Sequence, residues 1–321
     1  MPWQEVSTMS LRQEFVQLAQ QPDANVSQLC RRFGISRKTA YKWLARFADD
    51  GPAGLADHSR RPHATPYRTA ATIEARILTL RDQHPCWGPR KLAARLAALG
   101  VPDIPAPSTI GAILRRHGRI AAGEAAKHTA WQTFERAAPN DVWQLDFLGH
   151  LPVGSGRVHP LCILDDHSRY ALGLFACPDE QGTTVQAHLI TCFRRYGLPW
   201  AILSDNGPPW GVTHPGGALT WLGAWLLRLD IAVWHGRPGH PQTQGKVERF
   251  HRTVAAEVLT PYAYPDLPRC QAALDGWRTV YNHERPHQAL ALAVPASRYR
   301  LSPRPYPEVL APIAYGPDVF R

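Results

Sequence analysis

The sequence has 321 residues but no run of about 20 apolar ones, so no segment is long enough to cross a bilayer as a helix. Its first ten residues, MPWQEVSTMS, lack the apolar stretch of a secretory signal. Its six cysteines, at positions 30, 86, 162, 177, 192 and 270, include no C-x-x-C pair. We therefore expect no membrane association, no disulfide scaffold and no zinc site, but a cytoplasmic protein with reduced thiols.

Acidic residues are scarce in the first two-fifths of the chain. Residues 1–130 hold 19 Lys and Arg against 10 Asp and Glu, whereas residues 131–321 hold 17 against 16. A coding bias toward Arg would explain why Arg outnumbers Lys, but it would not explain this asymmetry. The distribution indicates a nucleic-acid-binding part followed by a part with another task. No G-x-x-x-x-G-K-[ST] loop is present, so no P-loop ATPase is expected.

Residues 1–50 are predicted to form a helix-turn-helix DNA-binding domain. Its second helix begins after Asn25, with Gln28 as capping-box partner, and ends at Gly34. The third helix begins after Ser36 and has an apolar face of Ala40, Trp43, Leu44 and Phe47. The opposite face carries the residues expected to contact DNA, which are Arg37, Lys38, Tyr41 and Lys42. A solvated face on an ordinary helical bundle is the alternative reading.

A linker is predicted for residues 51–70, which are rich in Pro and Gly. Arg60 and Arg61 lie in it and are candidates for DNA contact, although a plain solvated loop fits as well. Residues 71–120 predict a second helix-turn-helix-like domain, whose last helix is capped by Ser108. Its apolar stripes are Ile73, Ile77, Leu80, Leu92, Leu96, Leu99, Ile110, Ile113 and Leu114. Arg115 and Arg116 lie outside these stripes and are further candidates for DNA contact, although such helices also pack without a ligand.

From residue 139 the pattern changes to strands, so the chain is predicted to be multi-domain, with all-α units followed by a mixed-sheet α/β core. In VWQLDFLGHL, Trp143, Leu145 and Phe147 alternate with Gln144 and Asp146. The expected order is three antiparallel strands, then helix (183–196), strand, helix (218–229), strand (231–235) and helix. That is the element order of an RNase H-like core, here over residues 135–295, with a tail at 296–321.

Two aspartates stand out in this core. Asp205 follows the short strand WAILS, and the Asp-Asn-Gly that it begins is by itself good turn chemistry. Asp146 lies inside a strand, where Asp has a low propensity and needs a partner or a metal. The first and fourth strands are neighbours in a sheet of this element order, so we expect the two carboxylates to lie together.

A third carboxylate comes from the helix predicted in GHPQTQGKVERFHRTVAAEV, residues 239–258. If its apolar stripe packs on the sheet, Glu248 can join the two aspartates. Three carboxylates form an all-oxygen site that suits Mg²⁺ or Mn²⁺, with two ions expected about 3.5–4 Å apart. Gln244 and Arg252 lie one turn either side of Glu248 and are predicted to face DNA. Lys246 and Arg249 stand roughly 160° and 100° away around the helix, so they would reach DNA only at the edges of the site.

The motifs WQLDF, LSDNGPPW and HPQTQGKVERFHRT resemble the three catalytic motifs of DDE recombinases. YNHERPHQAL resembles the segment after that core in insertion-sequence transposases with an integrase-type core, and SRKTAYKWLARF and HPCWGPRKL resemble their N-terminal motifs. The resemblance spans nearly the whole chain and implies that Asp146, Asp205 and Glu248 are the catalytic, metal-binding triad. The helix-turn-helix front and the longer Asp205–Glu248 spacing differ from retroviral integrases.

This resemblance implies a transposase that binds double-stranded DNA, namely the terminal inverted repeats of an element and its target. It would hydrolyse one strand, join the freed 3′-hydroxyl to target DNA, assemble as a homo-oligomer on DNA and associate with the nucleoid. A structure-selective nuclease of the same fold and a regulator with an inactive core remain alternatives. Asp165 and Asp166 are interpreted as ordinary turn residues, and residues 282–287 as a structural or DNA-facing segment.

Overall fold

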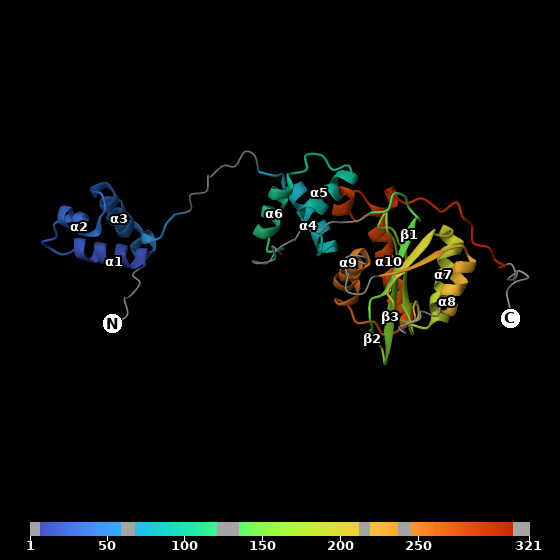
Figure 1. Cartoon of the computed structure of the whole chain (residues 1–321). Helices are drawn as coiled ribbons and strands as arrows, with labels where there is room; N and C mark the ends of the chain where they lie inside the picture. Colours follow the sequence, from blue (N-terminus) through green and yellow to red (C-terminus); the bar gives the residue numbers. More distant parts are fainter. Residues whose placement is uncertain (1–6, 59–67, 121–134, 212–218, 237–244, 311–321) are drawn as a thin grey trace, which may run out of the picture. The chain divides into compact units, whose positions relative to one another are not determined.

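A computed structural model describes residues 7–58, 68–120, 135–211, 219–236 and 245–310. They belong to two compact units, residues 1–68 and residues 69–321 (Figure 1). Within the described ranges, no helix is both long enough and apolar enough to span a membrane. Arg60, Arg61 and Gln244, three of the predicted DNA contacts, lie outside the described residues.

Unit 1 contains α1 (Thr8–Ala19), α2 (Val26–Phe33) and α3 (Arg37–Asp50), followed by a 3₁₀ helix, Gly51–Leu55. Asn25 and Ser36 cap α2 and α3 as predicted, because each side-chain oxygen accepts a 3.1 Å bond from the N–H three residues later. Gly34 ends α2 with φ of 64°, a left-handed conformation that glycine adopts without steric cost. A tight turn therefore joins α2 to α3, as a helix-turn-helix requires.

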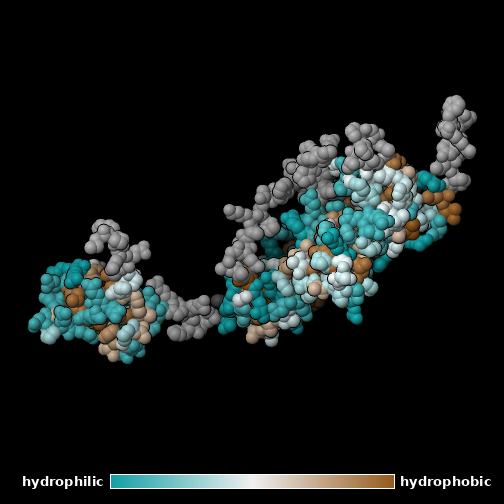
Figure 2. Space-filling view, turned by 90° about the horizontal axis from the view of Figure 1, so that it is seen from below, coloured by the Kyte–Doolittle hydropathy of each residue, from teal (hydrophilic) through white to brown (hydrophobic). Residues whose placement is uncertain are grey.

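The core of unit 1 extends past the predicted domain boundary at residue 50. Its buried side chains are Phe15, Val16, Cys30, Ala40, Trp43 and Leu55. Leu55 is only 1% exposed, and its carbonyl accepts a 2.8 Å bond from the Arg12 guanidinium. Residues 51–55, assigned to the linker from their composition, are thus part of the folded domain. Most of the surface of unit 1 seen in Figure 2 is hydrophilic.

The second helical domain contains α4 (Ala71–Gln83), α5 (Pro89–Ala98) and α6 (Pro107–Arg116). Its predicted apolar stripes are buried together with Trp87 and Val101, with one exception. Leu99 is 55% exposed, because α5 ends at Ala98. The predicted Ser108 cap is also wrong. The N-cap is Ala106, two residues earlier, and α6 begins at Pro107, whose fixed φ suits a first helical position.

The remainder of unit 2 is built on a mixed sheet, which in the described part of the chain has six strands. They are β1 (Val142–Phe147), β2 (Leu151–Val153), β3 (Gly156–Asp165), β4 (Ala171–Cys177), β5 (Ala201–Ser204) and β6 (Ala232–His235). β3 lies between β1 and β4, antiparallel to both, and β2 continues the pairing of β1 with β3. β1 pairs in parallel with β5, and β5 with β6. The predicted RNase H-like sheet is confirmed.

Helices cover both faces of the sheet (Figure 1). On one face, α7 (Gly182–Tyr196) and α8 (Trp221–Arg228) pack against Trp143, Leu145 and Ile202. On the other face, α9 (Gly245–Val254) and α10 (Leu267–His283) pack against side chains of β3 and β4, and a π-helical turn (Ala255–Leu259) follows α9. Because side chains alternate along a strand, β1 presents Gln144 and Asp146 to the α9 face.

The second helical domain also packs on this core. Val280 of α10 contacts its apolar cluster, and Arg95 of α5 forms an ion pair with Glu284 at the end of α10. After two 3₁₀ helices (Gln288–Leu290 and Pro295–Ser297), the chain returns over the α7 face. There Arg304 donates to the carbonyls of three residues, Pro199, Leu229 and Asp230. The described part of the predicted tail is therefore packed against the core.

Asn282 joins α10 to the sheet, and we expect its loss to be costly. It is 2% exposed; its Oδ1 accepts from the Ala171 N–H at 2.8 Å, and its Nδ2 donates to the Ala171 carbonyl at 3.0 Å. Asn282→Ala leaves both buried backbone groups unpaired, at roughly 1–3 kcal/mol each. Chemical unfolding of the full chain should show unit 2 destabilised by ~2–4 kcal/mol. Thr279→Ala, on the exposed side of the same helix, is the control; equal effects would contradict this role.

Candidate active site

The parallel pairing of β1 with β5 brings the two aspartates together. Val142, Trp143 and Gln144 pair in turn with Ala201, Ile202 and Leu203. Carried two residues further, the same register puts Asp146 beside Asp205, just beyond the end of β5. Gln144 and Leu203 are paired, and each aspartate lies two residues after its member of this pair. Because side chains alternate along a strand, the same register puts both aspartates on the same face of the sheet. The predicted pairing of strand ends is confirmed.

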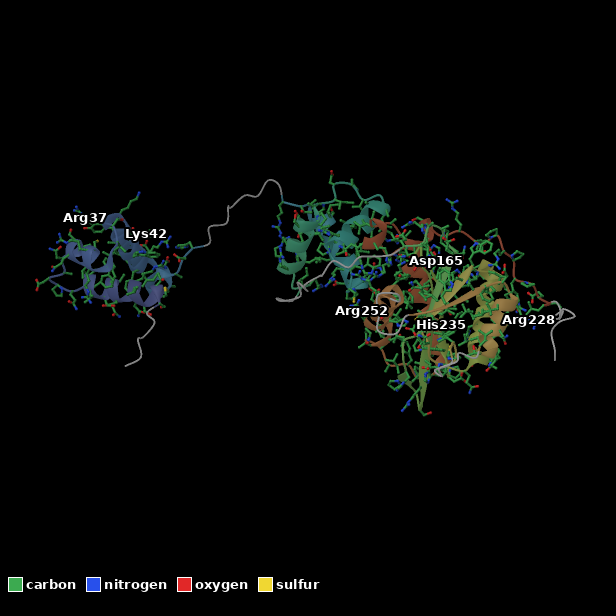
Figure 3. All side chains as sticks on the ribbon, viewed as in Figure 1. Arg37, Lys42, Asp165, Arg228, His235 and Arg252 are labelled. Atoms are coloured by element: carbon green, nitrogen blue, oxygen red, sulfur yellow. The ribbon has the colours of Figure 1, made fainter. Side chains whose placement is uncertain are left out.

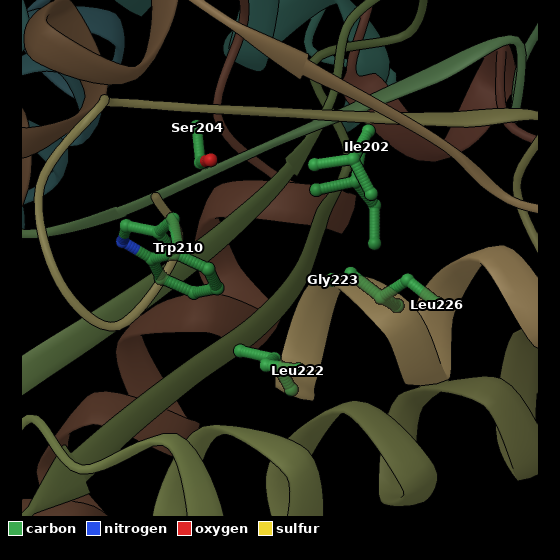
Figure 4. Close-up of a pocket in the computed structure, with 7 residues that line it drawn as sticks. Ile202, Ser204, Trp210, Leu222, Gly223 and Leu226 are labelled. Atoms are coloured by element: carbon green, nitrogen blue, oxygen red, sulfur yellow. The ribbon is translucent and has the colours of Figure 1, made fainter. Parts of the chain in front are cut away.

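The turn after Asp205 is anchored by Trp210. The Trp210 N–H donates to the Gly207 carbonyl at 3.0 Å, and the indole is 5% exposed. Figure 4 shows this ring beside Leu222 of α8, in an apolar contact that also involves β5. Its ring centroid lies 6.2 Å from that of Phe147, the residue after Asp146. The same aromatic pair thus braces the two strand ends that carry the carboxylates.

The helix α9 lies over the face that carries Asp146. Val247 and Phe250 are buried in the cluster that includes Cys162, the residue paired with Asp146 across β1 and β3. The Val247 N–H also donates to Oε1 of Gln144, at 3.2 Å. Glu248 follows Val247 and is exposed to solvent. The helix therefore brings its first turn, with Glu248, to the β1 end of the site.

The electrostatics agree with a shared site. Burial, together with the charges of Asp205 and Glu248, raises the pKa of Asp146 from its ordinary value to about 7. Burial also raises the pKa of Asp205, an effect opposed by a hydrogen bond from the Gly207 N–H. The charged form of Asp146 is thus disfavoured by burial and by the two neighbouring carboxylates.

His251, one turn after Glu248, also reaches Asp146. Its Nδ1 lies 3.8 Å from Oδ2 of Asp146, and its ring is largely buried. Burial lowers the pKa of His251 to about 4, so the ring is neutral at pH 7. Within the described residues, its buried Nε2 has no hydrogen-bond partner. His251 was not among the site residues predicted from the sequence, although its spacing of three residues from Glu248 puts it on the same side of α9.

The donor set fits a hard divalent cation, because Asp146, Asp205 and Glu248 offer only carboxylate oxygens. Burial is the largest cause of the raised pKa of Asp146, and the charges of Asp205 and Glu248 raise it further. Among the described residues, however, no group of three or more His, Cys, Asp and Glu side chains is already close enough to hold a metal ion. The three side chains are gathered at one end of the sheet but do not form a closed ligand shell.

Two acidic residues interpreted as ordinary turn residues are buried. Asp165 is 0% exposed and accepts from the N–H groups of Asn140 and Ser168. Asp166 is 6% exposed and forms an ion pair with Lys246, at 2.5 Å from Nζ to Oδ2. Lys246, a predicted DNA contact, therefore has its ammonium group on a buried carboxylate inside the core.

The other predicted DNA contacts lie at the surface. Arg37, Lys38, Tyr41 and Lys42 are all exposed on α3, while Ala40 and Trp43 are buried as predicted; Figure 3 shows Arg37 and Lys42. On α6 Arg115 and Arg116 are exposed, but Arg116 forms a 2.6 Å ion pair with Glu74 of α4. On α9 Arg249 and Arg252 are exposed and make no ion pair within the described residues.

The segment 282–287 contains a further pattern, His283-Glu284-Arg285-Pro286-His287, which has the spacing of the H-E-x-x-H zinc motif. That motif needs both histidines on one face of a helix. Here α10 ends at His283, and the His287 ring packs edge-on against Tyr281. Glu284 is engaged by Arg95. The two histidines therefore do not share one helix face as the zinc motif requires.

Comparisons with known families agree with this architecture. A helix-turn-helix domain model matches residues 11–63, and a homeodomain-like domain model matches residues 39–114. Two integrase core domain models match residues 136–241 and 229–295. The chain thus has helix-turn-helix domains followed by an integrase core, in the order predicted from its motifs.

Among known proteins, the chain is similar to two insertion-element proteins. It is 27% identical, over 50% of its length, to the uncharacterized 31.7 kDa protein of insertion element IS407 from Burkholderia multivorans. It is 25% identical, over 76% of its length, to the uncharacterized 39.2 kDa protein of IS476 from Xanthomonas euvesicatoria. These matches span 55% and 69% of the two relatives. The predicted resemblance to proteins of insertion sequences is confirmed.

The chain is also similar to a chain of the simian T-cell lymphotropic virus intasome in complex with PP2A regulatory subunit B56 gamma, solved by cryo-EM. That chain is 20% identical, with a TM-score of 0.44. The match covers 76% of this chain and 80% of that chain.

The raised pKa of Asp146 predicts a specific pH dependence. The folded state holds the carboxyl proton up to about pH 7, whereas an unfolded Asp loses it near pH 4, so stability falls as pH rises between these values. Without divalent metal at pH 8, Asp146→Asn should stabilise unit 2 by roughly 1–3 kcal/mol, since each pKa unit corresponds to about 1.4 kcal/mol. Unfolding in EDTA from pH 4 to 8 measures this. Asp275→Asn, on an exposed side chain, should show no such gain; a destabilised Asp146→Asn at pH 8 would show that the carboxylate is not crowded.

Proposed function

We propose that this chain, in which helix-turn-helix domains precede an integrase core, is a DNA transposase that binds the ends of its element, cleaves them and joins them to target DNA. The observation that carries the proposal is the register of β1 and β5, which sets Asp146 beside Asp205 under the helix that carries Glu248. Three carboxylates gathered at one sheet end suit phosphodiester chemistry with divalent metal. In a cell the protein would be found on DNA.

Asp146, Asp205 and Glu248 would hold Mg²⁺ or Mn²⁺, in two ions, which would supply Lewis-acid stabilisation of the phosphodiester and acidify the attacking water. In the first reaction, water attacks phosphorus and the 3′-oxygen of the element end leaves as a hydroxyl. In the second, that 3′-hydroxyl attacks a target phosphodiester and displaces another 3′-oxygen. The number of phosphodiester bonds is conserved in the second step, so joining needs no nucleotide hydrolysis.

The exposed arginines of α9 would position the cleaved strand. Arg252 lies one turn beyond Glu248 on the same side of the helix, and its planar fork suits a phosphate. Arg252 could instead pair with Glu257 or Glu248 and only stabilise the helix, but among the described residues it forms no ion pair with either. Glu257 accepts instead from the Trp277 indole N–H at 3.0 Å and from Arg285 at 2.7 Å. Arg252 is therefore available for DNA, and Arg249 would contact the strand at the edge of the site.

A nuclease of the same fold would cleave but not join, and a regulator with an inactive core would do neither. The near approach of Asp146 and Asp205 argues against an inactive core. All three acidic residues of the predicted triad, Asp146, Asp205 and Glu248, are also present in the sequence.

The proposal is tested by cleavage and strand-transfer assays with DNA that carries the inverted repeats flanking the gene. Asp146→Asn, Asp205→Asn and Glu248→Gln are near-isosteric but remove negative charge. Each should lower cleavage and joining by orders of magnitude, since residues that act as a unit are not additive. Binding of end DNA should be unchanged in all three. Near-normal cleavage by any variant would remove that residue from the triad, and cleavage without joining by the wild type would favour the nuclease.

Recognition of the element ends is assigned to α3, and Lys42 offers a quantitative test. Lys42 is exposed on α3, and its ammonium lies 4.1 Å from the ring centroid of Trp43, at the border between the exposed and the buried side of the helix. If Lys42 contacts a phosphate, Lys42→Ala should weaken binding of end DNA and lower the slope of log K against log salt by about one. Arg157→Ala, an exposed charge in the β2–β3 hairpin, is the control. Equal slopes for wild type and Lys42→Ala would exclude that contact.

A further inference from the structure

We propose that Asp166 is a positioning residue for the catalytic site: together with Gln144 and Lys246 it clamps the first turn of α9 to β1. The clamp would set where Glu248 lies relative to Asp146. This inference rests on the proposed function for its catalytic meaning. The contacts themselves are independent of it.

The clamp joins three elements through one buried carboxylate. Oδ1 of Asp166 accepts from Nε2 of Gln144 at 2.7 Å, and Oδ2 accepts from Nζ of Lys246 at 2.5 Å. Oδ2 also accepts from the Arg136 N–H at 3.0 Å, and the Asp166 carbonyl accepts from Lys246 at 3.3 Å. Gln144 belongs to β1, Asp166 follows β3, and Lys246 lies in the first turn of α9.

Gln144 closes the connection. Its amide N–H groups face Asp166, while its Oε1 accepts from the Val247 N–H at 3.2 Å. The first N–H groups of a helix have no partner within the helix, so this bond satisfies one that would otherwise be unpaired. The start of α9 is thus held to β1 twice, by its backbone at Val247 and by its Lys246 side chain through Asp166.

The residues of the clamp lie close in the sequence to two of the three triad carboxylates. Gln144 lies two residues before Asp146 and on the same face of β1, and Val247 immediately precedes Glu248. A shift at either clamped residue would therefore move one catalytic carboxylate against the other. Metal-dependent catalysis tolerates only about 0.5 Å of such displacement. Outer partners that orient metal ligands typically change metal affinity or activity by 10- to 100-fold when they are lost.

A purely structural role is the competing explanation, because the ion pair is buried. Gln144 is 1% exposed, and the side chains of Lys246 and Asp166 are 13% and 8% exposed. Removing one partner of such a pair leaves an uncompensated charge and destabilises the fold whatever its function. The test therefore needs a measurement that does not change when only the stability of the fold changes. It also needs a control variant at a residue that is buried to a similar extent.

Asp165→Asn provides that control. Asp165 is adjacent, 0% exposed and bonded to Asn140 and Ser168, but its carboxylate forms no hydrogen bond or ion pair with α9. The test variants are Asp166→Asn and Lys246→Met, with Lys246→Arg as the conservative substitution that can keep the pair. The double variant Asp166→Asn/Lys246→Met removes both charges and should be no worse than either single variant if the two act as a unit.

Two measurements on the full-length protein test the clamp. Hydrogen exchange without metal or DNA should show the amides of Val247 and the turn after it exchanging at least about tenfold faster in Asp166→Asn and Lys246→Met than in the wild type or Asp165→Asn. The Mn²⁺ concentration for half-maximal cleavage should rise about 10- to 100-fold in the same two variants. It should stay near the wild-type value in Lys246→Arg, and the affinity for end DNA in Ca²⁺ should not change.

The clamp is overturned if the α9 amides exchange at the wild-type rate in Asp166→Asn, or if Asp165→Asn accelerates them equally. It is also overturned if metal dependence is unchanged while α9 is loosened, because Glu248 would then not depend on the clamp. Exchange is measured in the absence of metal and DNA. Failure of the proposed cleavage reaction would therefore show in the triad assays and would leave the exchange result as a test of the clamp.

Discussion

The parallel register of β1 with β5 is the constraint on which the candidate site depends. It brings Asp146 beside Asp205 although 58 residues separate them in the sequence, and it fixes which face both carboxylates occupy. Everything else at the site supports that register. Trp210 holds the turn after Asp205 against the core, Phe147 meets Trp210, and α9 packs on the face where the carboxylates project. A one-residue slip would send one carboxylate to the opposite face.

This arrangement has a cost in the metal-free protein. Partly buried, crowded carboxylates lower the stability of the fold as the pH rises from about 4 to about 7, as the raised pKa of Asp146 indicates. The surrounding structure offsets that cost with strongly paired polar groups. The buried carboxylate of Asp166 forms an ion pair with Lys246 and accepts a hydrogen bond from Gln144. Glu257 forms an ion pair with Arg285 and accepts a hydrogen bond from the Trp277 indole. The candidate site is thus built on elements that also carry buried acids, and protein groups neutralise those acids.

Much of this could be predicted from the sequence, because local patterns determine it. Strict alternation placed Gln144 and Asp146 on one face, and side-chain caps at Asn25 and Ser36 marked two helix starts. Long-range burial could not be predicted. Asp165 and Asp166 have ordinary turn chemistry, and only the fold shows that they are enclosed and that Asp166 binds Lys246, 80 residues away. Two local predictions were wrong for a related reason. Residues 51–55 were assigned to the linker from their composition, but Leu55 packs in the core of unit 1. Ser108 was predicted to cap α6, but the helix begins at Pro107.

The central claim is that Asp146, Asp205 and Glu248 form one metal site at the end of β1 and β5. Anomalous diffraction from crystals of the protein soaked in Mn²⁺ tests it most directly, because the anomalous signal of manganese locates each bound ion. We expect an anomalous peak within direct coordination distance of Asp146 and Asp205, with Glu248 as a further ligand when DNA is present. A peak bound elsewhere, or none at these carboxylates with Mn²⁺ in excess, would contradict the account.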